Sequence, residues 1–143
     1  MYDRYFSYLA RHKFYTFIEC CKLGIPLRGL LHDLSKFLPS EFIPYAHHFY
    51  GQHAEIDKDY DFAWLQHIHR NMHHWQYYII IDLGIEEILP MPDEYRKEML
   101  ADWIGAGYAK NQPDVKDWYL KNKQFIRLHP ETTRWVESRL GIV

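Results

Sequence analysis

Apolar side chains recur at helical spacing along most of the chain. Over residues 2–23 they form one stripe, which consists of Phe6, Ala10, Phe14, Phe17 and Cys21. Residues three or four positions apart lie on one face of an α-helix, so the stripe predicts an amphipathic helix that packs this face against the core. Gly24 follows as a C-cap, and Ile25-Pro26 leaves the helix.

Proline and glycine divide the rest of the chain into six further helical segments. The predicted ranges are Leu30–Lys36, Pro39–Gly51, Asp59–Asp82, Pro92–Tyr108, Pro113–Leu128 and Pro130–Leu140. In the longest segment the inward positions are Ala63, Trp64, Ile68, Met72, Trp75 and Ile79. No segment shows the apolar–polar alternation of a strand. The pattern predicts an all-α fold, a compact single-domain helical bundle of six to seven helices over residues 1–143.

Composition narrows the class of protein. A chain of 143 residues with 48% hydrophobic and 25% charged residues has a normal globular mix. Its net charge of −2 argues against a basic nucleic-acid or membrane-surface module. The longest apolar run, Tyr77–Ile81, is far short of the roughly 20 residues of a membrane span. The first residues lack a secretory-signal pattern, and the only cysteines, Cys20 and Cys21, are adjacent, so we expect a reduced, cytoplasmic protein.

The chain contains ten histidines, which indicates a candidate metal site because imidazole is the commonest metal ligand. The pair His32-Asp33 can bind one ion if the helix turns there, although taken alone such a pair is more typical of a helix surface. His12 lies on a face that borders the apolar stripe of its helix, from which a side chain can reach a pocket. Asp102 has a similar position, with Glu98 one turn earlier, and its alternative is a solvated charge.

The densest histidine cluster is His67-Ile-His69-Arg70-Asn71-Met-His73-His74-Trp75. On a continuous helix His67, Asn71 and His74 form one row, and His69 and His73 lie on the opposite flank. Either pair of histidines has chelating geometry, and the alternative is a structural role. We expect the first row to face the site, because Ala63 leaves room beside it. The remaining histidines are expected at the surface, in loops or at a helix boundary: His47, His48, His53 and His129.

The order His12, His32-Asp33, Asp102 resembles the HD-domain superfamily of metal-dependent phosphohydrolases, whose pattern is H…HD…D on separate helices. The sequence is also similar to a small branch, often phage-encoded or bacterial, with motifs like His32-Asp-Leu-Ser-Lys-Phe37 and Arg70-Asn-Met-His-His-Trp75. The resemblance implies that His12, His32, Asp33 and Asp102 bind one metal ion. His67 and His74 are the candidates for a second ion or for substrate. The superfamily's glutamate after HD is absent from its usual place, and Glu41 is the nearest candidate.

The resemblance implies a metal-dependent phosphohydrolase that acts on a nucleotide or other small phosphoester through a metal-activated water. Mn, Fe, Co, Ni and Zn are all candidate ions, and one or two can be bound. Asp33, Lys36 and His73 are the expected catalytic residues. The expected substrate-binding residues are Lys36, Arg70, Asn71 and Trp75, with a core position as the alternative for Trp75. Two alternatives stay open: a dinuclear-iron oxygenase of HD type, and a non-catalytic regulator that binds a nucleotide or a protein.

Overall fold

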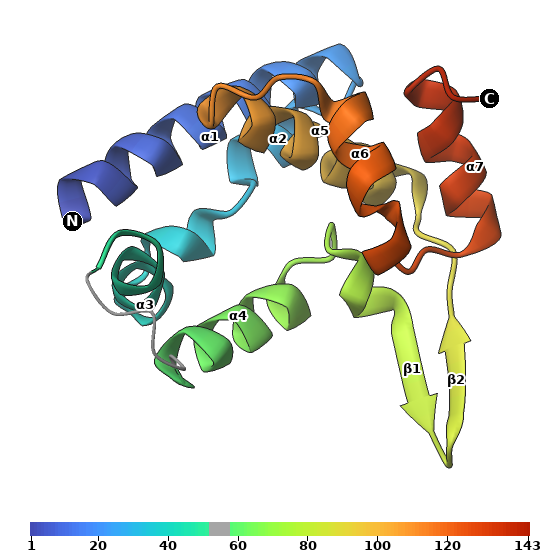
Figure 1. The fold of residues 1–143 in the computed structure, drawn as a ribbon, viewed down its shortest axis with the longest axis horizontal. Helices are drawn as coiled ribbons and strands as arrows, with labels where there is room; N and C mark the ends of the chain where they lie inside the picture. The colour runs from blue at the N-terminus through green and yellow to red at the C-terminus, as the bar shows by residue number, and fades with distance from the viewer. Residues whose placement is uncertain (52–57) are drawn as a thin grey trace.

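Seven α-helices account for most of the part of the chain that the computed structural model describes, residues 1–51 and 58–143 (Figure 1). They are α1 (Tyr2–Lys22), α2 (Pro26–Leu31), α3 (Pro39–Tyr50), α4 (Lys58–Arg70), α5 (Asp93–Ala109), α6 (Val115–Asn122) and α7 (Pro130–Arg139). With 72% of the structure helical, the predicted all-α bundle is confirmed. His53 lies outside the described residues. None of the described helices has the length and hydropathy that crossing a membrane requires.

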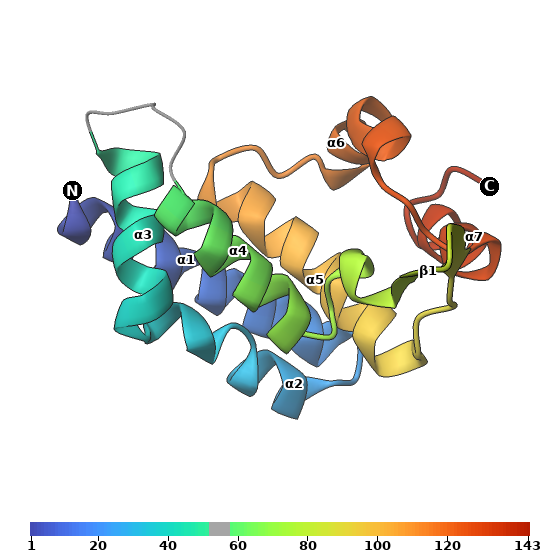
Figure 2. The ribbon, with the colours of Figure 1, turned by 90° about the horizontal axis from the view of Figure 1, so that it is seen from below.

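The helices form a body around the pair α1 and α5, which run antiparallel side by side (Figure 2). Helices α3 and α4 pack together next to α1, and α6 and α7 lie at the opposite end from the N-terminus. Two apolar clusters hold these parts together. One joins α1, α3 and α4 and contains Tyr5, Leu9, Tyr45, Ala46 and Ala63. The other joins α5, α6 and α7 and contains Tyr78, Met91, Met99, Tyr119 and Val136.

Helix α1 buries a different face from the one its apolar stripe predicts. Phe6 and Phe14 are 53% and 60% exposed, and Ala10 and Cys21 also face solvent. The buried face, one position earlier at most turns, consists of Tyr5, Leu9, His12, Thr16 and Cys20. On this face His12 Nε2 lies 3.0 Å from Asp102 Oδ1 on α5, and Thr16 packs against Gly105 of the same helix, so burial here follows the contacts to α5 rather than side-chain hydropathy.

Close packing of α1 against α5 depends on Gly105. A Cβ atom at this position would lie 2.7 Å from the backbone nitrogen of Thr16, which is closer than real contacts allow. Glycine therefore lets the two backbones approach at this level, although it lowers helix propensity by about 1 kcal/mol relative to alanine. This contact lies three residues beyond Asp102 on α5 and four beyond His12 on α1.

Two predicted helices are broken in the structure. The segment 30–36 divides into the end of α2 and a 3-10 helix over Leu34–Phe37, with His32 and Asp33 between them. The segment 59–82 is helical only to Arg70, and a turn and a second 3-10 helix, Trp75–Tyr78, follow. Of the inward positions expected there, Ala63 and Ile68 are buried. A smaller difference affects 113–128, where α6 ends at Asn122 and a 3-10 turn ends at Phe125.

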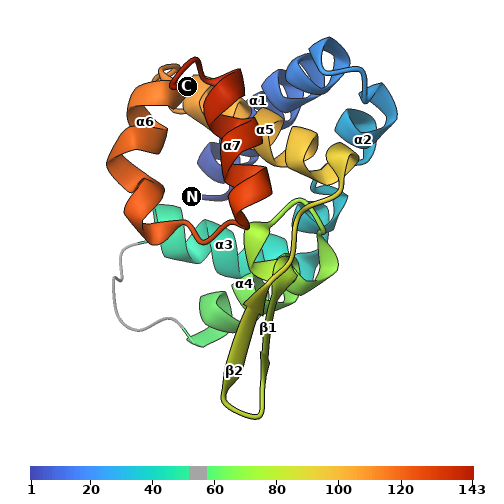
Figure 3. The ribbon, with the colours of Figure 1, turned by 90° about the vertical axis from the view of Figure 1, so that its right-hand side faces the viewer.

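The chain also contains a β-hairpin that the sequence analysis did not predict. Strands β1 (Ile79–Asp82) and β2 (Ile85–Ile88) pair antiparallel and project away from the helices (Figures 1 and 3). Both turn residues, Leu83 and Gly84, have positive φ angles of 48° and 74°, as a two-residue hairpin turn of type I′ requires. Three consecutive isoleucines favour a strand over a helix because β-branched side chains are restricted in a helix.

Candidate metal centre

The structure brings the four predicted ligands of the first ion together. His12 comes from α1, His32 and Asp33 from the break after α2, and Asp102 from α5. The Oδ1 atom of Asp102 lies 3.0 Å from His12 Nε2 and 3.3 Å from His32 Nε2. Asp33 Oδ2 lies 3.4 Å from His32 Nε2. One ligand atom from each residue lies within 4.8 Å of all the others, so this buried group is positioned to hold a metal ion.

The break after α2 is what directs two neighbouring side chains to one centre. His32 leaves the helix with φ −51° and ψ 128°, and Asp33 adopts the left-handed conformation with φ 53° and ψ 27°. Aspartate tolerates this conformation better than most residues. Helix α2 itself lies close on α1, because a Cβ atom at Gly29 would collide with Cys20. The turn that the sequence analysis required for joint binding by His32 and Asp33 is therefore present.

A second donor group shares Asp33 with the first. It contains His67 from the end of α4, and His73 and His74 from the turn that follows. Asp33 Oδ1 lies 3.4 Å from His67 Nε2 and 3.5 Å from His73 Nε2. The Nε2 atoms of all three histidines and Asp33 Oδ1 are buried without a hydrogen-bond partner among the described residues. Buried polar atoms without partners are costly, and a metal ion would satisfy all four.

The helical rows expected over residues 67–75 do not exist, because α4 ends at Arg70. The turn after α4 places His73 beside His67 and His74, whereas a continuous helix would have placed it on the opposite flank. His69 is exposed and its Nδ1 lies 2.8 Å from the carbonyl oxygen of Leu65. Only the first part of the expectation, that His67 and His74 face the site, agrees with the geometry.

Two glutamates, Glu98 and Glu41, contact the Nδ1 atoms of three histidines in the centre. Glu98 Oε1 lies 3.0 Å from His32 Nδ1 and 3.3 Å from His73 Nδ1, so a single carboxylate serves both donor groups. Glu41 Oε2 lies 2.8 Å from His67 Nδ1. A carboxylate on Nδ1 fixes the ring orientation and leaves Nε2 available, which is the usual arrangement around metal-binding histidines.

Each glutamate is only partly indicated by its sequence position. Glu98 lies one helical turn before Asp102, and Glu41 follows the His32-Asp33 motif, but Glu98 lies 66 positions from His32 and Glu41 lies 26 positions from His67. Those contacts depend on how α3, α4 and α5 pack.

The carboxylates and histidines of the centre shift each other's pKa values. Burial would lower the pKa of His32, but Asp33, Asp102 and Glu98 outweigh it and raise this pKa to about 10. Burial would raise the pKa values of Asp33 and Asp102, and neighbouring cationic groups hold both well below the usual range. Burial, assisted by His73, keeps the pKa of His74 well below its usual value, so His74 is neutral and its nitrogen can act as a ligand.

Two of the predicted substrate-binding residues contact the centre directly or through its glutamates. Lys36 Nζ lies 2.6 Å from Asp33 Oδ2, where its charge neutralises the shared carboxylate. Arg70 donates a hydrogen bond of 3.0 Å to Glu41 Oε1, so its charge stabilises a buried carboxylate that in turn holds a histidine.

The other two substrate candidates have structural contacts. Asn71 Nδ2 donates to the carbonyl oxygen of His67 at 2.9 Å and so closes the end of α4. It also lines, with Arg70 and His73, a cavity of about 140 Å³ beside the second donor group. Trp75 packs on the cluster between α5, α6 and α7, which agrees with its alternative role in the core.

Three further histidines of the described residues, His47, His48 and His129, lie outside the centre. His47 and His48 occupy the last turn of α3 and are exposed, which agrees with the expected surface position. His129 is the N-cap of α7, where its Nδ1 accepts a hydrogen bond from the backbone nitrogen of Glu131.

Fold and site together define an all-α protein with two buried His/Asp groups, both positioned to hold a metal ion and joined by one aspartate. Residues 1–142 match the family described as "Family of unknown function (DUF5662)", and the chain belongs to this family. None of the curated proteins matches the chain, and neither does any solved structure.

Proposed function

We propose that the protein is a metal-dependent phosphohydrolase of HD type that acts on a nucleotide or another small phosphoester. The observation that carries the proposal is the position of Asp33, whose two carboxylate oxygens face two separate groups of buried histidine nitrogens. A carboxylate shared in this way is suited to bridge two divalent ions. The mixture of imidazole and carboxylate ligands suits Mn, Fe, Co, Ni or Zn.

His12, His32, Asp33 and Asp102 would hold one ion, and His67, His73 and His74 would hold a second with Asp33. The chemistry that a bound divalent ion would supply there is polarisation of a phosphoryl oxygen and a lowered pKa for a coordinated water. Glu98 and Glu41 keep the histidine rings oriented, so that no reorganisation is needed when substrate arrives.

Lys36 is the residue placed to neutralise charge on the phosphate. Burial would lower its pKa, but Asp33 and Asp102 outweigh burial and raise it, so the ammonium group stays protonated. Its side chain is 15% exposed, as is that of Asp102, whereas those of His12, His32 and Asp33 are at most 3% exposed. Substrate would therefore approach on the side of Lys36 and Asp102.

Metal content and phosphate release from the variant Asp33→Asn test the proposal. Asparagine also tolerates the left-handed conformation, so the turn is preserved while the shared charge is lost. The matched control is Asp82→Asn in the exposed hairpin. Elemental analysis of untagged protein purified without chelator should give one or two equivalents of a transition metal. Phosphate release from a panel of nucleotides and aryl phosphates is measured with each candidate ion.

We expect Asp33→Asn to lose most of the metal and at least 100-fold of the activity, with Asp82→Asn unchanged in both. Hydrolysis that persists in Asp33→Asn would contradict the proposal, and so would a fully metallated protein that releases no phosphate from any member of the panel.

A dinuclear-iron oxygenase is the second candidate, because three imidazoles beside a shared carboxylate also suit iron. Two irons per chain together with an iron-dependent optical band would favour this activity over hydrolysis.

A further inference from the structure

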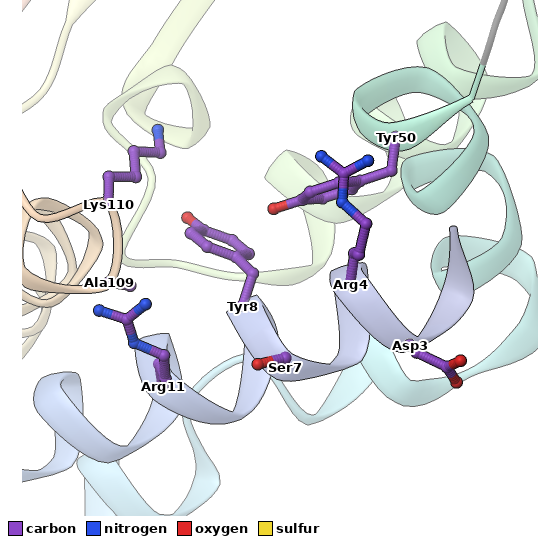
Figure 4. Close-up of a pocket in the computed structure, with 8 residues that line it drawn as sticks. All are labelled: Asp3, Arg4, Ser7, Tyr8, Arg11, Tyr50, Ala109 and Lys110. Atoms are coloured by element: carbon purple, nitrogen blue, oxygen red, sulfur yellow. The ribbon is translucent and has the colours of Figure 1, made fainter.

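A cationic pocket lies beside the metal centre, between the first half of α1 and the ends of α3 and α5 (Figure 4). Its volume is about 530 Å³, within the range of small-molecule sites. The residues that give it chemical character are Arg4, Tyr8, Arg11, Tyr50 and Lys110, with Asp3 as the single acidic residue. We call this space the α1–α5 pocket.

Helices α1 and α5, which supply His12 and Asp102, also supply residues that line this pocket. Tyr8 precedes His12 by one turn, and its ring stacks on the His12 ring with centroids 5.9 Å apart and planes 12° apart. Ala109 follows Asp102 by two turns on the antiparallel helix. At 1.5 Å per residue, Arg4 and Lys110 lie about 12 Å along their helices from these two ligands. Tyr8 is therefore the lining residue through which the pocket meets the first donor group, and Asp102 is the most exposed of the four ligands in that group.

Positive charge in the pocket is concentrated and largely uncompensated. The cationic groups of Arg4, Arg11 and Lys110 surround the space, and the Asp3 carboxylate points away from them (Figure 4). None of these three cations forms an ion pair with a carboxylate of residues 1–51 or 58–143.

Two of the charged groups in the α1–α5 pocket are held in place by neutral contacts. The Arg4 guanidinium lies 5.1 Å from the centroid of the Tyr50 ring. Arg11 donates to Asn111 Oδ1 at 2.9 Å and to the carbonyl oxygen of Tyr108 at 3.3 Å. These contacts orient the guanidinium groups without neutralising them. A site with fixed cations that lack counter-charges favours an anionic ligand.

The hydroxyl groups of Tyr8 and Tyr50 point into the space between the cations (Figure 4). A tyrosine hydroxyl carries its proton at neutral pH and can donate a hydrogen bond. Guanidinium, ammonium and hydroxyl donors around one open pocket match the many acceptor oxygens of a phosphate group better than a single carboxylate.

We propose that the α1–α5 pocket binds a second phosphate group of the substrate, so that the protein acts on compounds with two or more phosphate groups. This inference rests on the proposed function for the role of the metal centre, where the first phosphate group would react. The lining of the pocket begins at Tyr8, whose ring stacks on the His12 ring, so a nucleotide phosphorylated at two positions would place one phosphate group at the metal centre and the other among the cations. Linear polyphosphates can occupy the pocket alone.

The binding test uses inorganic tripolyphosphate, titrated calorimetrically into the full chain at low ionic strength, both as purified and after chelator treatment. The test variant is Arg4→Gln/Lys110→Gln. The control, Lys121→Gln/Arg139→Gln, removes the same net charge from α6 and α7 and leaves the pocket intact. We expect the dissociation constant to rise at least tenfold in the pocket variant and less than twofold in the control. Equal weakening in both variants, or no binding to the unaltered chain, would overturn the proposal.

A kinetic comparison separates this proposal from the proposed function. With a nucleoside 3′,5′-bisphosphate the pocket variant should raise KM at least tenfold and leave kcat within twofold. With the corresponding 5′-monophosphate both constants should stay near those of the unaltered protein. An unchanged KM for the bisphosphate would refute the pocket's role. If no phosphoester is hydrolysed at all but tripolyphosphate binding is still lost in Arg4→Gln/Lys110→Gln, the hydrolase is wrong and the phosphate site stands.

Discussion

Glu98 is the residue whose replacement gives the sharpest test of how the centre is held. Burial alone would raise its pKa, but hydrogen bonds from His32 and His73 outweigh burial and lower it from 4.5 to about 2. A shift of this size corresponds to about 3 kcal/mol of stability at neutral pH. A carboxyl group whose pKa is depressed by folding contributes fully above pH 4.5. The contribution is lost as the pH falls towards 2.

We predict that Glu98→Gln lowers the free energy of unfolding by about 3 kcal/mol at pH 7, or roughly 6–12 °C in Tm for a chain of this size. The measurement is urea unfolding of chelator-treated protein, followed by circular dichroism between pH 2 and 7. The loss of stability between pH 4.5 and 2 should be about 3 kcal/mol smaller in the variant than in the unaltered protein.

Glu94→Gln is the matched control, because Glu94 lies one turn earlier on α5 and forms an exposed ion pair with Arg28 at 2.9 Å. An exposed pair contributes less than about 1 kcal/mol, so the control should lose at most that amount. If Glu98→Gln is no more destabilising than Glu94→Gln, the argument that Glu98 holds both histidines through its charge is refuted.

Three further predictions concern the fold. Gly105→Ala should lower the free energy of unfolding by about 1–2 kcal/mol in urea titrations, because overpacking against Thr16 exceeds the gain in helix propensity; an increase in stability would contradict the close approach of α1 and α5. Leu83→Asn should increase the free energy of unfolding by less than about 1 kcal/mol and raise the Tm slightly, because asparagine tolerates the φ of 48° better than leucine. A lower Tm would argue against the turn geometry. His32, with its pKa raised to about 10, contributes stability that is complete below pH 6.5 and lost as the pH rises to 10. Chelator-treated protein should therefore unfold at lower urea concentration at pH 10 than at pH 7.

Three helix starts that proline marks could be predicted from the sequence to within one residue, whereas α2, which begins at Pro26, was predicted only from Leu30. Helix α3 begins at Pro39, α7 begins at Pro130, and α5 begins one residue after Pro92. Proline is favoured in the first turn of a helix, so these signals act locally and do not depend on the rest of the fold. The cytoplasmic location and the single-domain organisation were inferred from composition and stay predictions.

The segment after Arg70 shows where local pattern fails. Apolar residues at 72, 75 and 79 continue the helical period, but the chain turns at Asn71 and reaches a strand at Ile79. The isoleucine run and the following Leu83-Gly84 turn were the available signals for a hairpin. Because this break was missed, the sequence analysis placed His73 on the wrong side of His67.

The candidate site was predictable where order along the chain carries the information. His12, His32, Asp33 and Asp102 follow a known pattern, and the structure places them in one group. Glu98 and Glu41 could not be assigned in the same way, because each acts through a histidine on another segment.

The pairing of α1 with α5 also affects how the chain folds during synthesis. The first helix must wait for a partner that begins about 70 residues after it ends, at Asp93. Until then the nascent chain exposes the face of α1 that α5 covers, including Thr16, which lies against Gly105 and is fully buried in the folded protein. Contacts at such a long sequence separation form slowly, and exposed apolar surface in a partly folded chain promotes aggregation. We therefore expect the N-terminal half, when it is expressed alone up to the hairpin, to be retained by chaperones or to aggregate, and to become soluble when α5 is supplied.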